Sequence, residues 1–271
     1  MIFLALITNT FREAIQKKFI LIVFLVISVL LILFLSFLSL ESVESMNEFM
    51  MQLGQDSFRD AIIMFQNSLI SNIPFYVVFV LLMIMTSSFI PSMLEKGNID
   101  LLISKPISRT NIIIGKFLAT NAIIFVVLAY LVGTIWLMVS LKSGIWHFPF
   151  LLSIVGFTVI FAILYSIILF TGLVTQNSIL TILVNLILFF PITGILSARE
   201  QMIYTFVSSG PVKFIIDFFY YVLPKPWDVH AIMLKLIAGE TVDSWQPLIT
   251  SLVFMIAMLA LSIFYFKKKD Y

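Results

Sequence analysis

The side chains that usually carry out catalysis or bind metals are few in this sequence, and they stand apart from one another. Cysteine is absent, which excludes disulfides, thiol catalysis and thiolate metal sites. The two histidines, His147 and His230, are far apart, and no HExxH motif accompanies them. A phosphate-binding GxxxxGK-S/T loop is also absent, because Gly115-Lys116 lacks the upstream glycine and precedes Phe117. We therefore predict no catalytic residues and no nucleotide site of the chain's own.

A methionine-rich passage in residues 41–64 is the nearest approach to a metal site. Its thioethers suit Cu(I), and they belong to Met46, Met50, Met51 and Met64. However, the spacing of Met46, Phe49, Met50 and Leu53 is the i, i+3, i+4, i+7 pattern of a packed helix. We therefore expect these methionines to pack and predict no metal site.

A charged passage between two very hydrophobic runs, Glu95 to Lys116, has a residue order that favours docking to a partner. Gly97 permits a sharp exit from the preceding run, Asn98 can cap a short helix, and Pro106 prevents its smooth continuation. An amphipathic helix of this kind can insert apolar side chains into a groove on a soluble protein, while its charges set the register. A solvated loop whose basic residues only fix topology is the alternative. The docking residues we expect are Glu95, Gly97, Ile99, Asp100, Leu101, Leu102, Ile103, Pro106, Arg109 and Lys116.

Composition places these residues in an all-α polytopic membrane protein. Hydrophobic residues make up 61% of the chain and charged residues 11%, which no ordinary soluble domain of 271 residues would carry. A hydrocarbon core of about 30 Å needs roughly 20 apolar helical residues, and lipid leaves unpaired backbone groups unsatisfied. The long uncharged runs should therefore be helices. The six transmembrane helices predicted lie near residues 19–40, 70–94, 117–141, 148–174, 179–198 and 247–266.

Orientation follows from the charged residues, because Lys and Arg near span ends are retained on the cytoplasmic side. With both termini inside, the inner segments hold ten of the 16 basic residues but only four of the 14 acidic ones. Residues 41–60, the first outer loop, are the most acidic part of the chain. We expect the inner membrane, with both termini cytoplasmic. The net charge of +2 is explained by topology and needs no nucleic-acid partner.

Two further segments are predicted to be amphipathic. Residues 1–18 show helical spacing of apolar residues, typical of an interfacial helix or a simple topology anchor. Residues 199–246 form a long outer loop, in which Pro211 opens one short helix that Pro224 stops. Asp228 can cap a second helix ending near Gly239. This outer loop could act as an exit gate or rest on the bilayer as a lid.

Polar residues within the predicted spans are candidates for a translocation pathway. Asn121, Asn177 and Asn185 are the best placed, and interhelical hydrogen bonding is the alternative for each. No Asp, Glu, Lys, Arg or His lies deep in a predicted span, which counts against ion-coupled transport. Pro91 and Pro191 are expected to kink or end their helices.

The sequence resembles the type-2 ABC exporter permease family, and the resemblance rests on the passage from Glu95 to Lys116. An acidic residue and a glycine, a leucine pair, a proline and an arginine, and a glycine-lysine pair occur in the order typical of that family's coupling segment. The matching residues are Glu95, Gly97, Ile99, Asp100, Leu101, Leu102, Ser104, Pro106, Ser108, Arg109, Gly115 and Lys116. The permeases of the nitrous-oxide-reductase maturation type look most similar. Asn98 departs from a frequent threonine or serine, although it too can cap a helix.

The resemblance implies a single transmembrane permease domain over residues 1–271, with an interfacial helix (1–18), a coupling segment (95–116) and an outer loop (199–246). It implies an exporter subunit that pairs with a second permease chain and docks a separate ABC ATPase, which would bind ATP and Mg. The permease would not itself be an enzyme. A membrane anchor that does not transport, and an intramembrane enzyme, are the alternatives; the absence of acidic residues and histidine from the spans counts against the enzyme.

Overall fold

The computed structural model describes residues 18–37, 55–71, 73–104, 107–207 and 209–269, which form helices joined by short connections. The predicted interfacial helix of residues 1–18 and the methionine stripe from Met46 to Leu53 lie almost wholly outside these residues. The helices of the described part are α2 (Phe19–Phe37), α4 (Gln55–Ser71), α5 (Ile73–Ser87), α6 (Phe89–Met93), α7 (Asn98–Ile103), α8 (Arg109–Ser143), η1 (Phe148–Leu151), α9 (Leu152–Thr175), α10 (Ser178–Ile187), η2 (Leu188–Ile192), α11 (Thr193–Ser197), α12 (Arg199–Met202), α13 (Gly210–Val222), α14 (Pro226–Ala238) and α15 (Gln246–Lys268).

Five helical stretches in the described part are long and apolar enough to cross a membrane, and they match five of the predicted spans. They cover Phe58–Met93, Arg109–Ser143, Phe148–Thr175, Ser178–Ser197 and Gln246–Lys268. The first predicted span coincides with α2, whose 19 residues carry no charge. The all-helical membrane architecture is therefore confirmed, while the count of six spans stays a prediction. The stretch Phe58–Met93 begins well before residue 70, where the second span was predicted to start, because α4 is already helical from Gln55.

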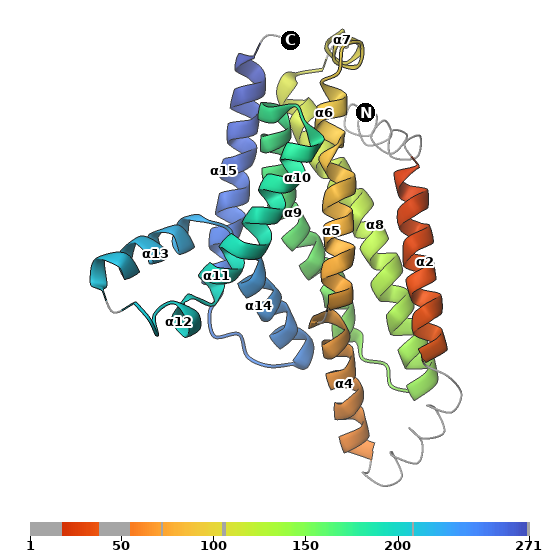
Figure 1. Cartoon of the computed structure of the whole chain (residues 1–271). Coiled ribbons are helices and arrows are strands. Elements are labelled where there is room, and N and C mark those ends of the chain that lie inside the picture. The colour runs from red at the N-terminus through yellow and green to blue at the C-terminus, as the bar shows by residue number, and fades with distance from the viewer. Residues whose placement is uncertain (1–17, 38–54, 72, 105–106, 208, 270–271) are drawn as a thin grey trace.

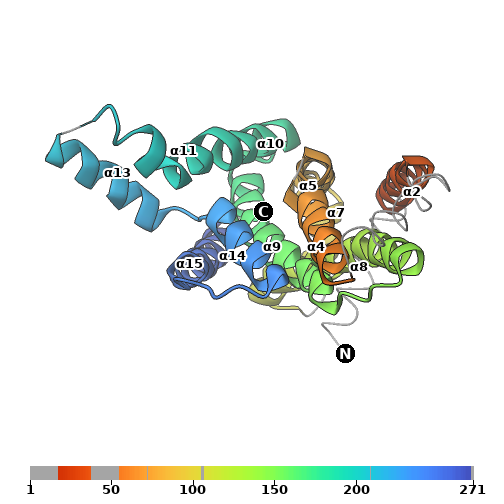
Figure 2. The ribbon, with the colours of Figure 1, turned by 90° about the horizontal axis from the view of Figure 1, so that it is seen from below.

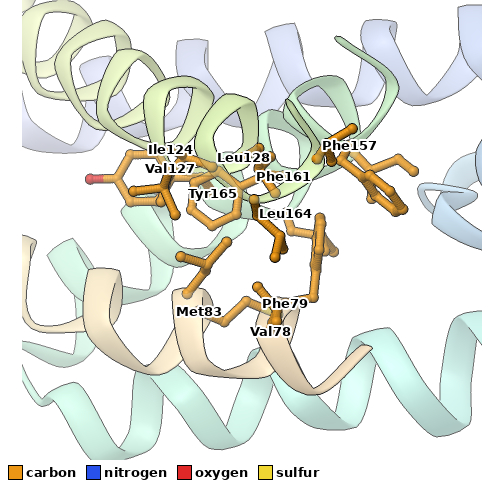
Figure 3. Close-up of a cluster of buried hydrophobic side chains, with 14 of the residues drawn as sticks. Val78, Phe79, Met83, Ile124, Val127, Leu128, Phe157, Phe161, Leu164 and Tyr165 are labelled. Carbon is orange, nitrogen blue, oxygen red and sulfur yellow. The ribbon is translucent and has the colours of Figure 1, made fainter. Parts of the chain in front are cut away.

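Helix α9 occupies the centre of the bundle. It packs against α15, α8, α14, α10 and α5, and Figure 2 shows these helices around it. In Figure 3, side chains of α5, α8 and α9 meet in one cluster, in which Phe161, Leu164 and Tyr165 are fully buried. The Tyr165 hydroxyl also accepts a hydrogen bond from Thr120 Oγ1 of α8 at 3.0 Å. Close packing and occasional hydrogen bonds of this kind hold helices together where lipid removes the hydrophobic driving force.

The two ends of the bundle differ. Figure 1 places α7, the start of α8 and the C-terminal end of α15 at one end, while α4, α12 and α14 lie toward the other. The sequence assigned the first group to the cytoplasm and the second to the outside, and each group indeed shares one end. We call these the inner and the outer end. Which end faces the cytoplasm stays a prediction.

Both prolines expected to disturb their helices lie at irregular points. Pro91 is in α6, which Ser88 separates from α5. Pro191 lies inside η2, a π-helical segment between α10 and α11. A π-helical turn leaves carbonyl groups open to other donors. The main-chain oxygen of Phe189 accepts hydrogen bonds from Thr193 Oγ1 at 2.7 Å and from Trp227 Nε1 at 2.9 Å.

The outer loop contains the two predicted short helices, α13 and α14, with one correction. Pro211 lies in the first turn of α13, and Gly239 ends α14 with a φ of +74°. Asp228, however, does not cap α14. Lys225 stands at the N-cap position, and the Asp228 carboxylate accepts hydrogen bonds from Ser197 and from Tyr220. The nearby hydroxyl groups offer Asp228 better partners than the start of its own helix.

Helix α13 projects sideways from the bundle (Figures 1 and 2). The amphipathic character predicted for this segment is present as an apolar stripe that is largely uncovered: Phe214 is 73% exposed, and Ile215, Phe218, Phe219 and Val222 are each about half exposed. The exposure is compatible with both expected roles of the outer loop, a gate and a lid on the bilayer.

Candidate docking site

Helix α7 is the short helix expected between the second and third spans. The chain leaves α6 through Gly97, whose φ of +91° is a conformation that favours glycine. The Gly97 N–H lies 3.4 Å from Asp100 Oδ2, so the acidic residue closes the first turn. Asn98 does not cap the helix, contrary to expectation. Its Nδ2 donates instead to the Ser92 carbonyl at 2.9 Å, which ties α7 to the end of α6.

The exposed part of the segment is polar. Glu95, Lys96, Gly97, Asn98 and Asp100 are all exposed, and they form the surface that we call the α7 edge. Ile99, by contrast, is only 4% exposed and belongs to the bundle core. The side chains of Leu101, Leu102 and Ile103, and all of Pro106, lie outside the described part. Of the predicted docking residues, the charged ones at the start of α7, Glu95 and Asp100, are therefore accessible. Ile99 is buried and is not available to a partner.

Arg109 makes contacts that the sequence did not predict. Its Nη1 lies 3.1 Å from the carbonyl oxygen of Phe266, 3.2 Å from that of Lys267 and 2.7 Å from that of Lys269. The guanidinium also stands 6.0 Å from the centre of the Phe266 ring. The last carbonyl groups of a helix lack partners within it and attract cations. Arg109, the first residue of α8, thus binds the C-terminal end of α15.

Lys116, the last of the predicted docking residues, is only 2% exposed on α8. It lies two helical turns beyond Arg109 and away from the α7 edge in the chain. The structure therefore divides the predicted set: the acidic residues Glu95 and Asp100 are exposed, whereas Arg109 binds the end of α15 and Lys116 is buried.

The three candidate pathway residues make local hydrogen bonds. Asn121 Nδ2 donates to the Phe117 carbonyl of its own helix at 2.8 Å. Asn177 caps α10, because its Oδ1 accepts from the main-chain N–H of Ile179 and Leu180. Asn185 is fully buried, and its Nδ2 donates to Thr181 in the same helix at 2.9 Å and lies 3.4 Å from Thr171 Oγ1 of α9. These contacts favour a structural role, and a pathway role remains a proposal.

An aromatic cluster at the outer end was not foreseen from the sequence. Residues from α5, α9, η2 and α14 line a small crevice there: Tyr76, Phe79, Phe157, Ile160, Phe189, Pro226, Trp227 and His230. His230 Nδ1 lies 3.3 Å from the Tyr76 hydroxyl, although 154 residues separate the two. Burial lowers the pKa of His230. Periodicity could not have found this cluster, because its residues come from four elements that are far apart in the sequence.

The histidines do not form a metal site. His147 Nδ1 pairs with Gln66 Oε1 at 2.9 Å, which joins α4 to the connection before η1. Within the described residues, no three His, Asp or Glu side chains come together in a way that could hold a metal ion. Met64, the one methionine of the first outer passage that the structure describes, is exposed on α4.

The sequence matches the family described as ABC-2 family transporter protein over residues 4–271. The chain belongs to this family. No curated protein matches the sequence. The match covers nearly the whole chain, including the α7 edge, the bundle and the outer helices. The resemblance to type-2 ABC permeases is thereby confirmed, whereas the likeness to the nitrous-oxide-reductase maturation type stays an expectation.

Membership in the ABC-2 family makes the chain a membrane component of an ABC transporter, in agreement with its long apolar helices. This identity also explains why the sequence shows no phosphate-binding loop, because such components work with an ATPase. At the inner end of the bundle, the α7 edge is one accessible charged surface of this ABC-2 protein among the described residues.

Proposed function

We propose that this chain is the permease subunit of an ATP-driven exporter and that a separate ABC ATPase docks on the α7 edge. One observation carries the proposal most directly: four polar residues, Glu95, Lys96, Asn98 and Asp100, stay exposed at the start of a helix that is itself anchored to the bundle. An ATPase groove can therefore engage charged side chains whose position is fixed by Gly97, Asn98 and Ile99.

The proposed cycle is mechanical. ATP and Mg bind the ATPase subunits, whose approach to one another pulls the two α7 segments of a permease pair together. The pair consists of this chain with a second copy or with a homologue. Docking energy that differs between two states of the pair shifts their populations. The spans then open the pathway alternately to the two sides, with both termini and α7 in the cytoplasm at the inner membrane.

Purification from the native membrane in mild detergent tests this function. Mass spectrometry should find an ATPase with a phosphate-binding loop in a stoichiometric ratio, and the same material should hydrolyse ATP. Reproducible absence of such a subunit would contradict the proposal and favour a membrane anchor. An ATPase that binds and hydrolyses ATP without moving any substrate in vesicles would also favour the anchor.

A further inference from the structure

Helix α15 is held at its inner end by the coupling segment. Arg109 belongs to that segment (95–116), and its guanidinium lies within hydrogen-bond distance of three carbonyl oxygens at the end of α15. Nη1 carries only two N–H groups, so the three oxygens share them. Ser108 caps α8 by accepting from the Asn111 N–H at 3.2 Å, which fixes the point from which Arg109 reaches. A shift of the start of α8 must therefore pull on α15 or break these contacts.

The outer end of α15 is held by a second basic residue. Lys225 lies between α13 and α14 and is only 3% exposed. Its main-chain N–H donates to Ser251 Oγ at 2.9 Å, and its Nζ donates to Thr250 Oγ1 at 2.8 Å. Both hydroxyl groups belong to the first turns of α15. The connection between the outer helices is thus fastened to the helix whose other end Arg109 binds.

The outer helices form one connected unit around this point. Lys225 Nζ stands 4.7 Å from the centre of the Tyr220 ring, and the Arg199 guanidinium stands 3.5 Å from the same ring. The Tyr220 hydroxyl donates to Asp228 at 3.0 Å, and Arg199 Nε donates to Asp217 at 2.9 Å. These contacts join α12, α13 and α14, so that a displacement at Lys225 would move the exposed apolar face of α13 with it.

Between its two ends, α15 packs one face along α9 and leaves the other face exposed. Among the five long apolar stretches it is the least buried, and Val253, Ile256 and Phe264 are each more than 60% exposed. Its 23 residues span about 35 Å as a rigid helix. A helix that is packed on one face only can tilt or shift as a rigid rod along that face, and its hydrogen-bonded ends must follow their partners.

We propose that α15 transmits displacement of the coupling segment to the outer helices, with Arg109 as its inner anchor and Lys225 as its outer anchor. This inference rests on the proposed function, because an ATPase must move the coupling segment. It adds a route that the α7 edge alone does not provide. The position of α13, at the outer end, would change with the nucleotide state of the ATPase, and α15 would transmit that change. Coupling of this kind requires that both ends change together between two states.

The absence of cysteine permits site-directed spin labelling without background thiols. An outer label pair at Val212→Cys and Leu141→Cys reports α13 against α8, and an inner pair at Ser104→Cys and Val174→Cys reports the coupling segment against α9. All four positions are exposed. Distances are measured by electron spin resonance on the complex with its ATPase, without nucleotide and with ATP plus orthovanadate.

We expect the nucleotide to shift both distances in the otherwise unchanged chain. The change in distance between the inner labels is called the inner shift, and that between the outer labels the outer shift. In a Thr250→Val, Ser251→Ala variant, which removes the two hydroxyl partners of Lys225, the inner shift should persist and the outer shift should be lost. Arg109→Gln should likewise abolish the outer shift. Ser262→Ala is the matched control, because Ser262 is buried on α15 and its hydroxyl donates to Met258 of the same helix.

Persistence of the outer shift in the Thr250→Val, Ser251→Ala variant would overturn the inference, as would an inner shift without any outer shift in the unchanged chain. Either result would leave the proposed function intact. Absence of a bound ATPase, or of any inner shift, would instead overturn the proposed function and this inference together. Loss of the outer shift in Ser262→Ala as well would show a general effect of altering α15 and would also count against the anchors.

Discussion

Arg109 Nη1 lies 2.7 Å from the main-chain oxygen of Lys269, so that the first residue of α8 binds the last turn of α15. This contact turns a residue expected on a docking surface into a link between two spans. The proposed docking surface that remains is the α7 edge, with Glu95, Lys96 and Asp100 as its charged members.

Replacing Arg109 with alanine should loosen the end of α15. The carbonyl oxygens of the last turn would lose their cationic partner, which is worth about 1 kcal/mol. Amide hydrogen exchange in residues 264–269 should therefore become about five-fold faster. Lys96→Ala is the control, because Lys96 is exposed on the α7 edge and should leave that exchange unchanged. Equal exchange rates in wild type and Arg109→Ala would show that the guanidinium does not hold α15.

Gly172 allows α9 to approach α6 closely. A Cβ atom at this position would lie 3.0 Å from Ile90 Cβ and 3.4 Å from Pro91 Cδ, and neither neighbour is a flexible side chain. Gly172→Ala should therefore destabilise the bundle by about 1–3 kcal/mol. Gly133→Ala is the matched substitution, because nothing lies within 4 Å of its added Cβ, and it should be neutral or slightly stabilising. Thermal unfolding in detergent measures both; a higher melting temperature for Gly172→Ala would contradict the close approach.

The Lys225 ammonium should make the outer junction depend on pH. Burial lowers the pKa of Lys225 from its ordinary value of 10.5 to about 8. Between these two values the unfolded chain retains a proton that the folded chain has released. The free energy of unfolding should therefore rise with pH from about 8 toward 10.5.

A Lys225→Met variant lacks this titration and serves as the comparison. The melting temperature of the wild type should rise relative to that of the variant as the pH is raised from 7 to 9.5. Tyr220, whose pKa is raised to about 12 by burial, and the neighbouring Arg199 do not change charge in this range. Parallel curves for the two proteins would show that Lys225 is not buried as described.

Two asparagines proposed for the pathway should respond differently to substitution. Asn177 accepts hydrogen bonds from two main-chain N–H groups at the start of α10, so Asn177→Ala should cost about 1 kcal/mol. Asn185 has a buried Oδ1 without a hydrogen-bond partner among the described residues, so Asn185→Leu should change stability by less than about 1 kcal/mol. Comparing melting temperatures in detergent tests the order, and a larger loss in Asn185→Leu would reverse it.

Sequence reasoning succeeded where one stretch of chain decides the outcome. Uncharged runs predicted the five long apolar helical stretches, and Gly97 predicted the sharp exit that its φ of +91° shows. The second predicted span was placed near residues 70–94, whereas the apolar helical stretch begins at Phe58 and includes polar residues such as Gln66. His147 forms a hydrogen bond with Gln66 and so provides a partner for a buried polar side chain of α4.

Contacts between distant segments were beyond the reach of sequence patterns. Arg109 and Lys269 are 160 residues apart, and Tyr76 and His230 are 154 residues apart. Asp228 was expected to cap its own helix, but it accepts from Ser197 and Tyr220 instead. A carboxylate accepts hydrogen bonds from the donors that the packing of other helices places near it. Hydrophobic periodicity along the sequence does not predict that packing.

The most direct test of the central claim is the amount of ATPase that co-purifies with two charge-reversal variants. Glu95→Lys alters the α7 edge, and Glu240→Lys makes the same change at an exposed glutamate after α14 at the outer end. The account predicts that Glu95→Lys lowers the ratio of ATPase to permease several-fold, while Glu240→Lys leaves it at the wild-type value. An unchanged ratio in Glu95→Lys, or an equal loss in both variants, would contradict docking on α7.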